Sequence, residues 1–183
     1  ALVAAGHDAV LVIIAALAER AVIASRECSK ELPLNTRPRH RPGMTSFPAP
    51  RMIDAGGVRL AIYEADAPSA KADAGKPPPV ILVHGWPEIA YSWKNQIGAL
   101  AAAGYRAIAP DLKGFGRSDA PKDKSLYDIR HMTDDLARLL DALNIESAVF
   151  CGHDWGGAIV WPMAQLHPGR VAGVIGVCTP HRA

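Results

Sequence analysis

The sequence has few cysteines, and no two of them have the spacing of a disulfide or metal-binding motif. The three cysteines, at positions 28, 151 and 178, form no CxxC pair, and their odd number argues against a disulfide framework or a zinc site. We therefore expect reduced thiols, a cytoplasmic location and no bound metal. The run Gly114-Phe115-Gly116 lacks the Lys-Ser/Thr pair and the further glycines of a phosphate-binding loop, so no cofactor is expected.

The sequence also lacks a strong excess of charge and a long apolar run. It has 20 Lys and Arg against 18 Asp and Glu, and the excess lies within residues 1–43. Without a basic surface in the remaining chain, we expect no nucleic-acid partner. The apolar run at residues 9–18 is about half as long as a membrane span, and no basic stretch precedes it as in a secretory signal. A membrane partner is therefore not expected.

Residues 1–43 differ in composition from the rest of the chain. Pro and Arg are interleaved between Pro33 and Pro42, which is typical of an unpacked linker. The chain begins with Ala1, whereas Met44 stands just before the regular patterns described next. We interpret residues 1–43 as a poorly ordered extension or linker and Met44 as the natural start. A weak membrane-surface helix is the alternative.

From residue 51 onward, strand patterns alternate with helix patterns. Strands are expected at 58–63, 80–83, 107–110, 148–151 and 171–177, and helices at 93–103, 128–143 and 157–166. This order predicts an α/β fold with a mostly parallel sheet and helices on both faces. Ligands of such sheets bind beyond the carboxyl ends of the strands, where the loops 84–88, 111–119, 152–157 and 178–181 fall.

Two details of the predicted helices bear on packing. Asp134 and Asp135 lie on the polar face of the helix at 128–143, where we expect them to be solvated. Pro162 falls inside the helix at 157–166, where a proline removes a hydrogen bond, so the helix is expected to kink or to begin later.

The central motif is Gly152-His153-Asp154-Trp155-Gly156-Gly157, between an apolar strand and a helix. Small residues two positions either side of Asp154 allow a sharp turn that exposes its side chain, and the helix N-terminus keeps a carboxylate ionised. Taken by itself, this motif would also fit an aspartate that only caps the helix. Two further motifs, at residues 84–88 and 111–118, stand at the ends of other strands.

Together the three motifs resemble those of the α/β hydrolases, with Asp154 at the nucleophile position of the elbow. The resemblance covers residues 47 to 183. It implies that residues 44–183 are the first part of an α/β-hydrolase domain, truncated before the cap and the last strands. It also implies that the backbone N–H groups of Trp86 and Trp155 form the oxyanion hole.

In finer detail the sequence is similar to soluble epoxide hydrolases. The strings HGWPE and HDWGG, and the stretch Tyr91-Ser92-Trp93 with Gln96, carry this similarity. Haloalkane dehalogenases, which share the Asp-Trp-Gly elbow, are the alternative. The resemblance implies a small-molecule substrate, an epoxide or else an alkyl halide, and it assigns substrate contacts to the residues His84, Pro87, Trp155 and His181.

The residue at the elbow indicates the type of reaction. An ionised Asp154 suits displacement at a saturated carbon, which forms an alkyl-enzyme ester that water then hydrolyses. The family performs this hydrolysis with a His and an acidic residue further along the chain, and it protonates the epoxide oxygen with cap tyrosines. We therefore do not expect residues 1–183 alone to complete turnover. A non-catalytic binding protein or a degenerate fragment with an exposed strand at 171–177 is the alternative from another class.

Overall fold

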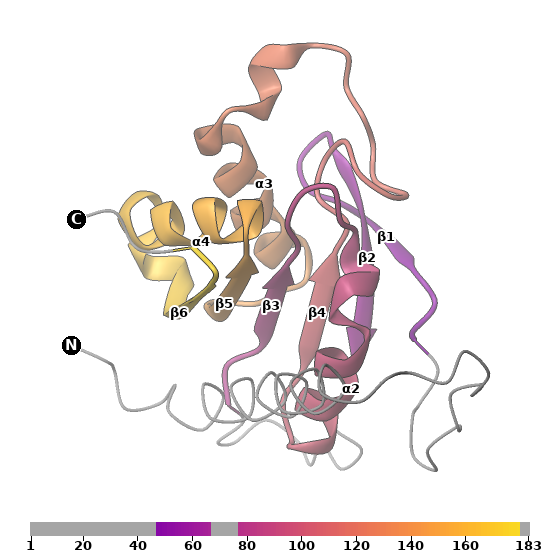
Figure 1. Ribbon diagram of the computed structural model, residues 1–183. Helices are drawn as coiled ribbons and strands as arrows, with labels where there is room; N and C mark the ends of the chain where they lie inside the picture. Colours follow the sequence, from indigo (N-terminus) through magenta and orange to yellow (C-terminus); the bar gives the residue numbers. More distant parts are fainter. Residues whose placement is uncertain (1–46, 67–76, 180–183) are drawn as a thin grey trace, which may run out of the picture.

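A six-stranded mixed sheet forms the centre of the protein (Figure 1). The computed structural model describes residues 47–66 and 77–179, so the predictions for residues 1–43 and for Met44 lie outside the described residues. The strand order is β1-β2-β4-β3-β5-β6. The strands are β1 (Arg51–Asp54), β2 (Arg59–Ala65), β3 (Val80–Val83), β4 (Ala107–Pro110), β5 (Ala148–His153) and β6 (Val171–Val177).

The sheet is parallel from β4 to β6 and antiparallel where β1 and β2 join it. The buried strands β3 and β4 and the edge strand β6 have the predicted bounds, because each is an apolar run between loops. In contrast, β1 was not predicted, since its sequence RMID mixes charged and apolar residues and its pairing to β2 is antiparallel. The predicted α/β architecture is confirmed.

Helices cover both faces of the sheet, as predicted. They are η1 (Ala90–Trp93), α2 (Lys94–Ala102), η2 (Lys124–Tyr127), α3 (Ile129–Ala142), α4 (Trp155–Leu166) and η3 (Pro168–Arg170). Alternate strand residues point into two separate apolar cores. Ile81 and Phe150 pack with α3 and α4, whereas Leu82 and Cys151 pack with η1 and α2. Among the described residues, no helix is long and apolar enough to cross a membrane.

Helix α4 departs from the prediction at Pro162. The helix begins at Trp155, two residues before the predicted start, and continues through Pro162 to Leu166, so the expectation of a later start is wrong. The proline removes one donor from the helix. Ile159, Val160 and Met163 bury the same helix in the core, and this packing stabilises it despite the missing hydrogen bond.

The predicted solvation of Asp134 and Asp135 is also wrong for Asp135. Asp135 is 4% exposed, and its carboxylate lies 2.6 Å from the ammonium group of Lys113, which is itself 2% exposed. Burial is the largest influence on Asp135 and raises the pKa of its carboxyl, although Lys113 opposes this. Asp134 pairs with His167 at 3.1 Å. The Lys113 pair joins the loop after β4 to α3.

Candidate active site

Asp154 occupies the sharp turn between β5 and α4. Its φ of 52° and ψ of −117° lie in a region that side-chain-bearing residues rarely adopt. The turn closes tightly because its neighbours are glycines. A Cβ atom at Gly152 would lie 2.3 Å from the carbonyl oxygen of Gly156, and one at Gly156 would lie 2.1 Å from that of Val83. This geometry leaves the Asp154 side chain exposed at the carboxyl end of the sheet.

Two backbone N–H groups converge on the Asp154 carboxylate. The N–H of Trp86 donates to Oδ1 at 3.0 Å, and the N–H of Trp155 donates to the same carboxyl group. These donors, with that of Trp86 the larger influence, lower the pKa of Asp154. The close approach needs Gly85, where a Cβ would lie 2.8 Å from the Cβ of Asp154. The structure thus brings the three residues Asp154, Trp86 and Trp155 together.

Glu88 connects the loop after β3 to the end of β5, a role that the sequence analysis missed. Its Oε2 accepts a hydrogen bond from the N–H of Gly85 at 3.0 Å and lies 3.1 Å from Nδ1 of His153. The Trp86-Pro87 peptide bond within this loop is cis. Glu88 belongs to the HGWPE string, but nothing in the string shows that its partner is the residue before Asp154.

His84 lies beneath the site rather than in it, which corrects its predicted contact with substrate. The side chain is fully buried, and its Nε2 accepts a hydrogen bond from the N–H of Leu112 at 3.0 Å. Its Nδ1 therefore donates to the carbonyl of Gly85 at 2.8 Å. Burial lowers the pKa of His84, which favours this neutral form. His84 holds the loops after β3 and β4 together.

Beside Asp154 lies a cavity of about 280 Å³ with mainly apolar walls. Its lining combines both loops with α3 and α4, and comprises Gly85, Trp86, Leu112, Phe115, Tyr127, Ile129, Met132, Trp155 and Ile159. In Figure 1 the segment between β4 and α3, which includes η2, rises above the carboxyl ends of β3 and β5. The Tyr127 hydroxyl donates to the carbonyl of Pro121 at 2.8 Å. The cavity therefore offers its occupant a largely apolar surface.

The remaining predicted site residues have different outcomes. Trp86 and Trp155 line the cavity and are 64% and 57% exposed, so both indoles remain open to further contacts. Pro87 is exposed and is not one of the lining residues. His181 lies outside the described residues. Among the cavity residues that were not predicted as site residues, Phe115 lies within the motif at 111–118, whereas Tyr127, Ile129 and Met132 come from segments with no motif of their own.

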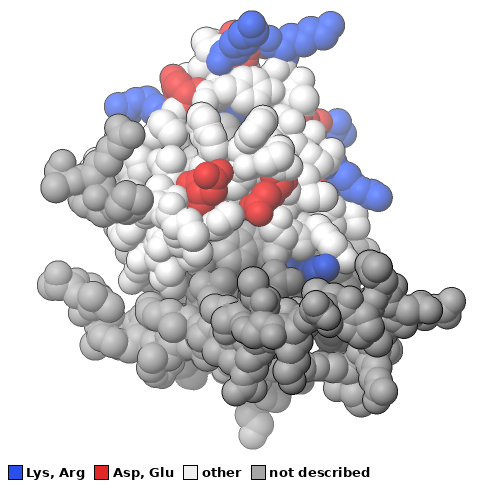
Figure 2. All heavy atoms as spheres, in the orientation of Figure 1, with Lys and Arg blue, Asp and Glu red and all other residues white. Residues whose placement is uncertain are grey.

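Charged side chains are few on the face of the molecule that Figure 2 shows. Figure 2 shows Lys and Arg mainly around the rim of this face, with uncharged atoms and two groups of acidic atoms nearer its centre. Within residues 47–66 and 77–179, no group of three or more His, Cys, Asp and Glu side chains is placed to hold a metal ion. The Asp154 carboxylate and the backbone donors from Trp86 and Trp155 lie beside the cavity.

This fold, with an aspartate at the strand-to-helix turn and backbone donors from two loops, defines an α/β hydrolase. The family described as alpha/beta hydrolase fold matches residues 78–183, and the chain belongs to it. Its relatives are named as epoxide hydrolases, which confirms the resemblance seen in the sequence.

Three relatives define the extent of this similarity. Epoxide hydrolase A of Mycobacterium tuberculosis (strain ATCC 25618 / H37Rv) is 48% identical over 133 residues, which is 73% of this chain and 39% of the relative. An epoxide hydrolase of Caballeronia sordidicola is 51% identical over 108 residues, or 59% of this chain and 33% of the relative. The crystal structure of Epoxide Hydrolase A from Mycobacterium thermoresistibile matches with a TM-score of 0.67 and 47% identity over 74% of this chain and 40% of that one. The chain thus spans about two fifths of these proteins or less.

Proposed function

We propose that this chain carries the alkylation site of an epoxide hydrolase, with Asp154 as the nucleophile. The observation that supports this proposal most strongly is the placement of the Asp154 carboxylate. Its Oδ1 accepts the Trp86 N–H at the edge of an apolar cavity, and its pKa is lowered, so the group is ionised at neutral pH. An ionised carboxylate attacks a saturated carbon without a base to activate it.

In the proposed first step, Oδ2 of Asp154 attacks an epoxide carbon from the cavity side. A carbon–oxygen bond to Asp154 forms, the epoxide carbon–oxygen bond breaks, and the released alkoxide takes up a proton. In residues 1–183 alone this proton comes from water, in place of the cap tyrosines that the resemblance implies. Oδ1 stays with the Trp86 N–H and becomes the carbonyl oxygen of the ester. It is then already in place to carry the negative charge when water attacks the ester carbonyl. That second step releases a vicinal diol and restores Asp154.

The second step needs a general base, and none of the four described histidines lines the cavity. His84 contacts Gly85 and Leu112, and the remaining three pair with carboxylates, as His131–Asp128, His153–Glu88 and His167–Asp134. We therefore propose that residues 1–183 alone stop at the ester, and that turnover requires the His, the acidic residue and the cap tyrosines that the resemblance implies. The substrate is a small apolar epoxide, since the cavity walls are mainly apolar.

The test is to incubate the 183-residue chain with styrene oxide and to map adducts by mass spectrometry of its peptides. The matched control is Asp154→Asn, which keeps the shape and loses the nucleophile. We expect an ester on the wild-type peptide that contains Asp154 and none on the variant. If wild-type Asp154 stays unmodified, the proposal is wrong. A parallel reaction with 1-chlorohexane tests the haloalkane alternative, which predicts faster labelling by the halide.

A further inference from the structure

The last residue of β6 and the segment after it hold the two backbone polar groups of Asp154. The Asp154 N–H donates to the carbonyl of Val177 at 3.2 Å, and the hydroxyl of Thr179 donates to the Asp154 carbonyl at 2.8 Å. That carbonyl also accepts the N–H of Ala158 at 3.2 Å, which is the first hydrogen bond of α4. Thr179 is therefore a side chain, distant in the sequence, that contacts the backbone at the elbow itself.

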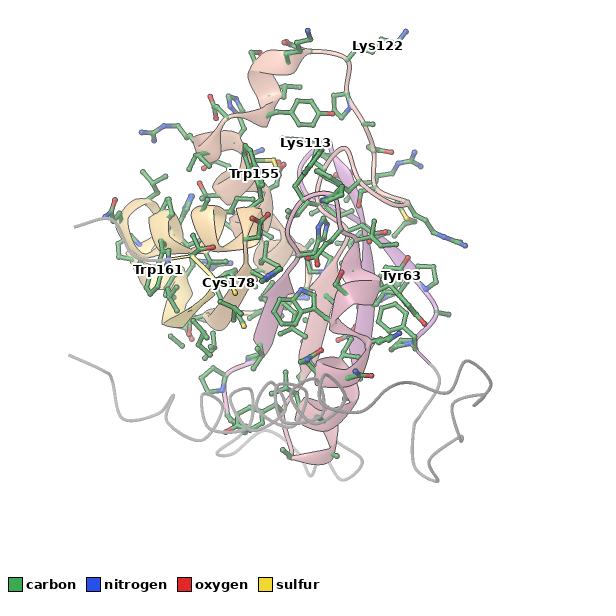
Figure 3. The ribbon with its side chains drawn as sticks, viewed as in Figure 1. Tyr63, Lys113, Lys122, Trp155, Trp161 and Cys178 are labelled. Carbon is green, nitrogen blue, oxygen red and sulfur yellow. The ribbon has the colours of Figure 1, made fainter. Side chains whose placement is uncertain are left out.

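Two glycines leave space for Thr179, and a tryptophan donates a hydrogen bond to its backbone. A Cβ atom at Gly157 would lie 2.5 Å from both Cβ and Oγ1 of Thr179, so the second glycine of the HDWGG string makes room for this side chain. A Cβ at Gly176 would lie 2.7 Å from the Thr179 carbonyl oxygen. The indole N–H of Trp161 donates to that same oxygen at 3.0 Å. Figure 3 labels Trp161 and also Cys178, which precedes Thr179 in the chain.

The Asp154 carbonyl and the Trp155 N–H belong to one planar peptide group. Because the plane is rigid, a donor that fixes the direction of the carbonyl also fixes the direction of the N–H on the opposite side. The backbone at Asp154 is strained, and such a conformation persists only where its surroundings hold it. The Thr179 hydroxyl supplies such a contact at the peptide plane itself.

We propose that Thr179 is a positioning residue, whose hydroxyl orients the peptide plane between Asp154 and Trp155 and so aims the Trp155 N–H at the Asp154 carboxylate. The catalytic part of this inference rests on the proposed function, since the aimed N–H is one of the two donors to the nucleophile. Thr179 does not touch the substrate in this role. The orientation of the plane can be measured without any reaction.

The first experiment measures amide hydrogen exchange by NMR in the full chain and in Thr179→Val, which removes the hydroxyl and nearly keeps the shape. The valine variant is expected to exchange the Trp155 amide about tenfold faster, as for the loss of one hydrogen bond. The Trp86 amide, which donates to the same carboxylate from another loop, serves as the internal control and should not change. Equal acceleration of both amides would mean general loosening and would overturn the proposal, as would no change at Trp155.

The second experiment measures the rate of ester formation at Asp154 with styrene oxide. Thr179→Val is expected to react several-fold more slowly, and Thr179→Ser, which retains the hydroxyl, to react at nearly the wild-type rate. If wild-type Asp154 is not alkylated, the proposed function fails while the exchange result stands by itself. If wild-type Asp154 is alkylated and the valine variant reacts equally fast, the role of Thr179 is refuted instead.

Discussion

Replacement of Lys113 by methionine tests how the loop beside the cavity is held. Lys113 and Asp135 are 2% and 4% exposed and lie 2.6 Å apart, so Lys113→Met leaves a buried carboxylate with only the more distant and exposed Arg138, at 4.0 Å, in place of its close cation. Breaking a buried pair from one side costs about 3–5 kcal/mol. Since a domain of this size has about 5–15 kcal/mol of unfolding free energy, this single change removes a large part of it. The loss should reach the cavity, because Leu112 and Phe115, on either side of Lys113 in the chain, line it.

The assay is urea unfolding of the full chain followed by circular dichroism. Lys113→Met combined with Asp135→Leu removes both charges and should recover most of the stability. Arg59→Met, which breaks the exposed pair with Asp119, is the control and should change little. Without Lys113 the pKa of Asp135 rises further, so stability is fully present at low pH and is lost as pH rises through that pKa. A loss below about 1 kcal/mol at neutral pH would refute the account of the buried pair.

Three further predictions concern single residues. The backbone donors keep the pKa of Asp154 below its usual value of about 3.9, so the alkylation rate should stay constant from neutral pH down to that value, and a midpoint near pH 6 would contradict this. The stability that this lowered pKa contributes is present above the unfolded-state pKa and is lost as pH falls through the folded-state pKa. Gly156→Ala should prevent folding or lower the melting temperature strongly, because its Cβ meets a backbone oxygen, whereas Gly169→Ala faces open space and should not, as thermal unfolding will show. Iodoacetamide should label exposed Cys178 in the folded chain but spare Cys151, whose thiol pKa burial raises to about 12, and peptide mapping will reveal any label on Cys151.

Much of the fold could be predicted from the sequence, because its signals are local. The apolar runs at 80–83, 107–110 and 171–177 became strands with those bounds, and the helical spacing after Asp128 became α3, which the Asp128 side chain caps. The strand order could not be predicted, because pairings such as β2 with β4 join segments far apart in the chain. Pro162 shows the same limit, since its local penalty is outweighed by packing against other elements.

The backbone donors of the candidate site could be predicted from its motifs. The partners of its buried side chains could not. Trp86 and Trp155 were named from their motifs, and the structure places both N–H groups on Asp154. The burial of Asp135 was missed because its partner, Lys113, lies in a loop rather than one helical turn away. His84 has a motif position like that of a site residue, yet both ring nitrogens contact backbone groups, which no local pattern reveals.

The strained backbone at Asp154 implies that the native residue at this position is not the one that stabilises the fold most. A φ of 52° with ψ of −117° suits glycine far better than a residue with a side chain, and such strain costs on the order of 1–3 kcal/mol. A library of variants selected only for resistance to unfolding should therefore enrich glycine at position 154 over the native aspartate. Stability engineering without an activity screen would then remove the proposed nucleophile among its first substitutions. Conversely, if another residue stabilises the fold more than the native aspartate, the native residue is kept for a reason other than stability. Such a position is a candidate functional site even before a substrate is known.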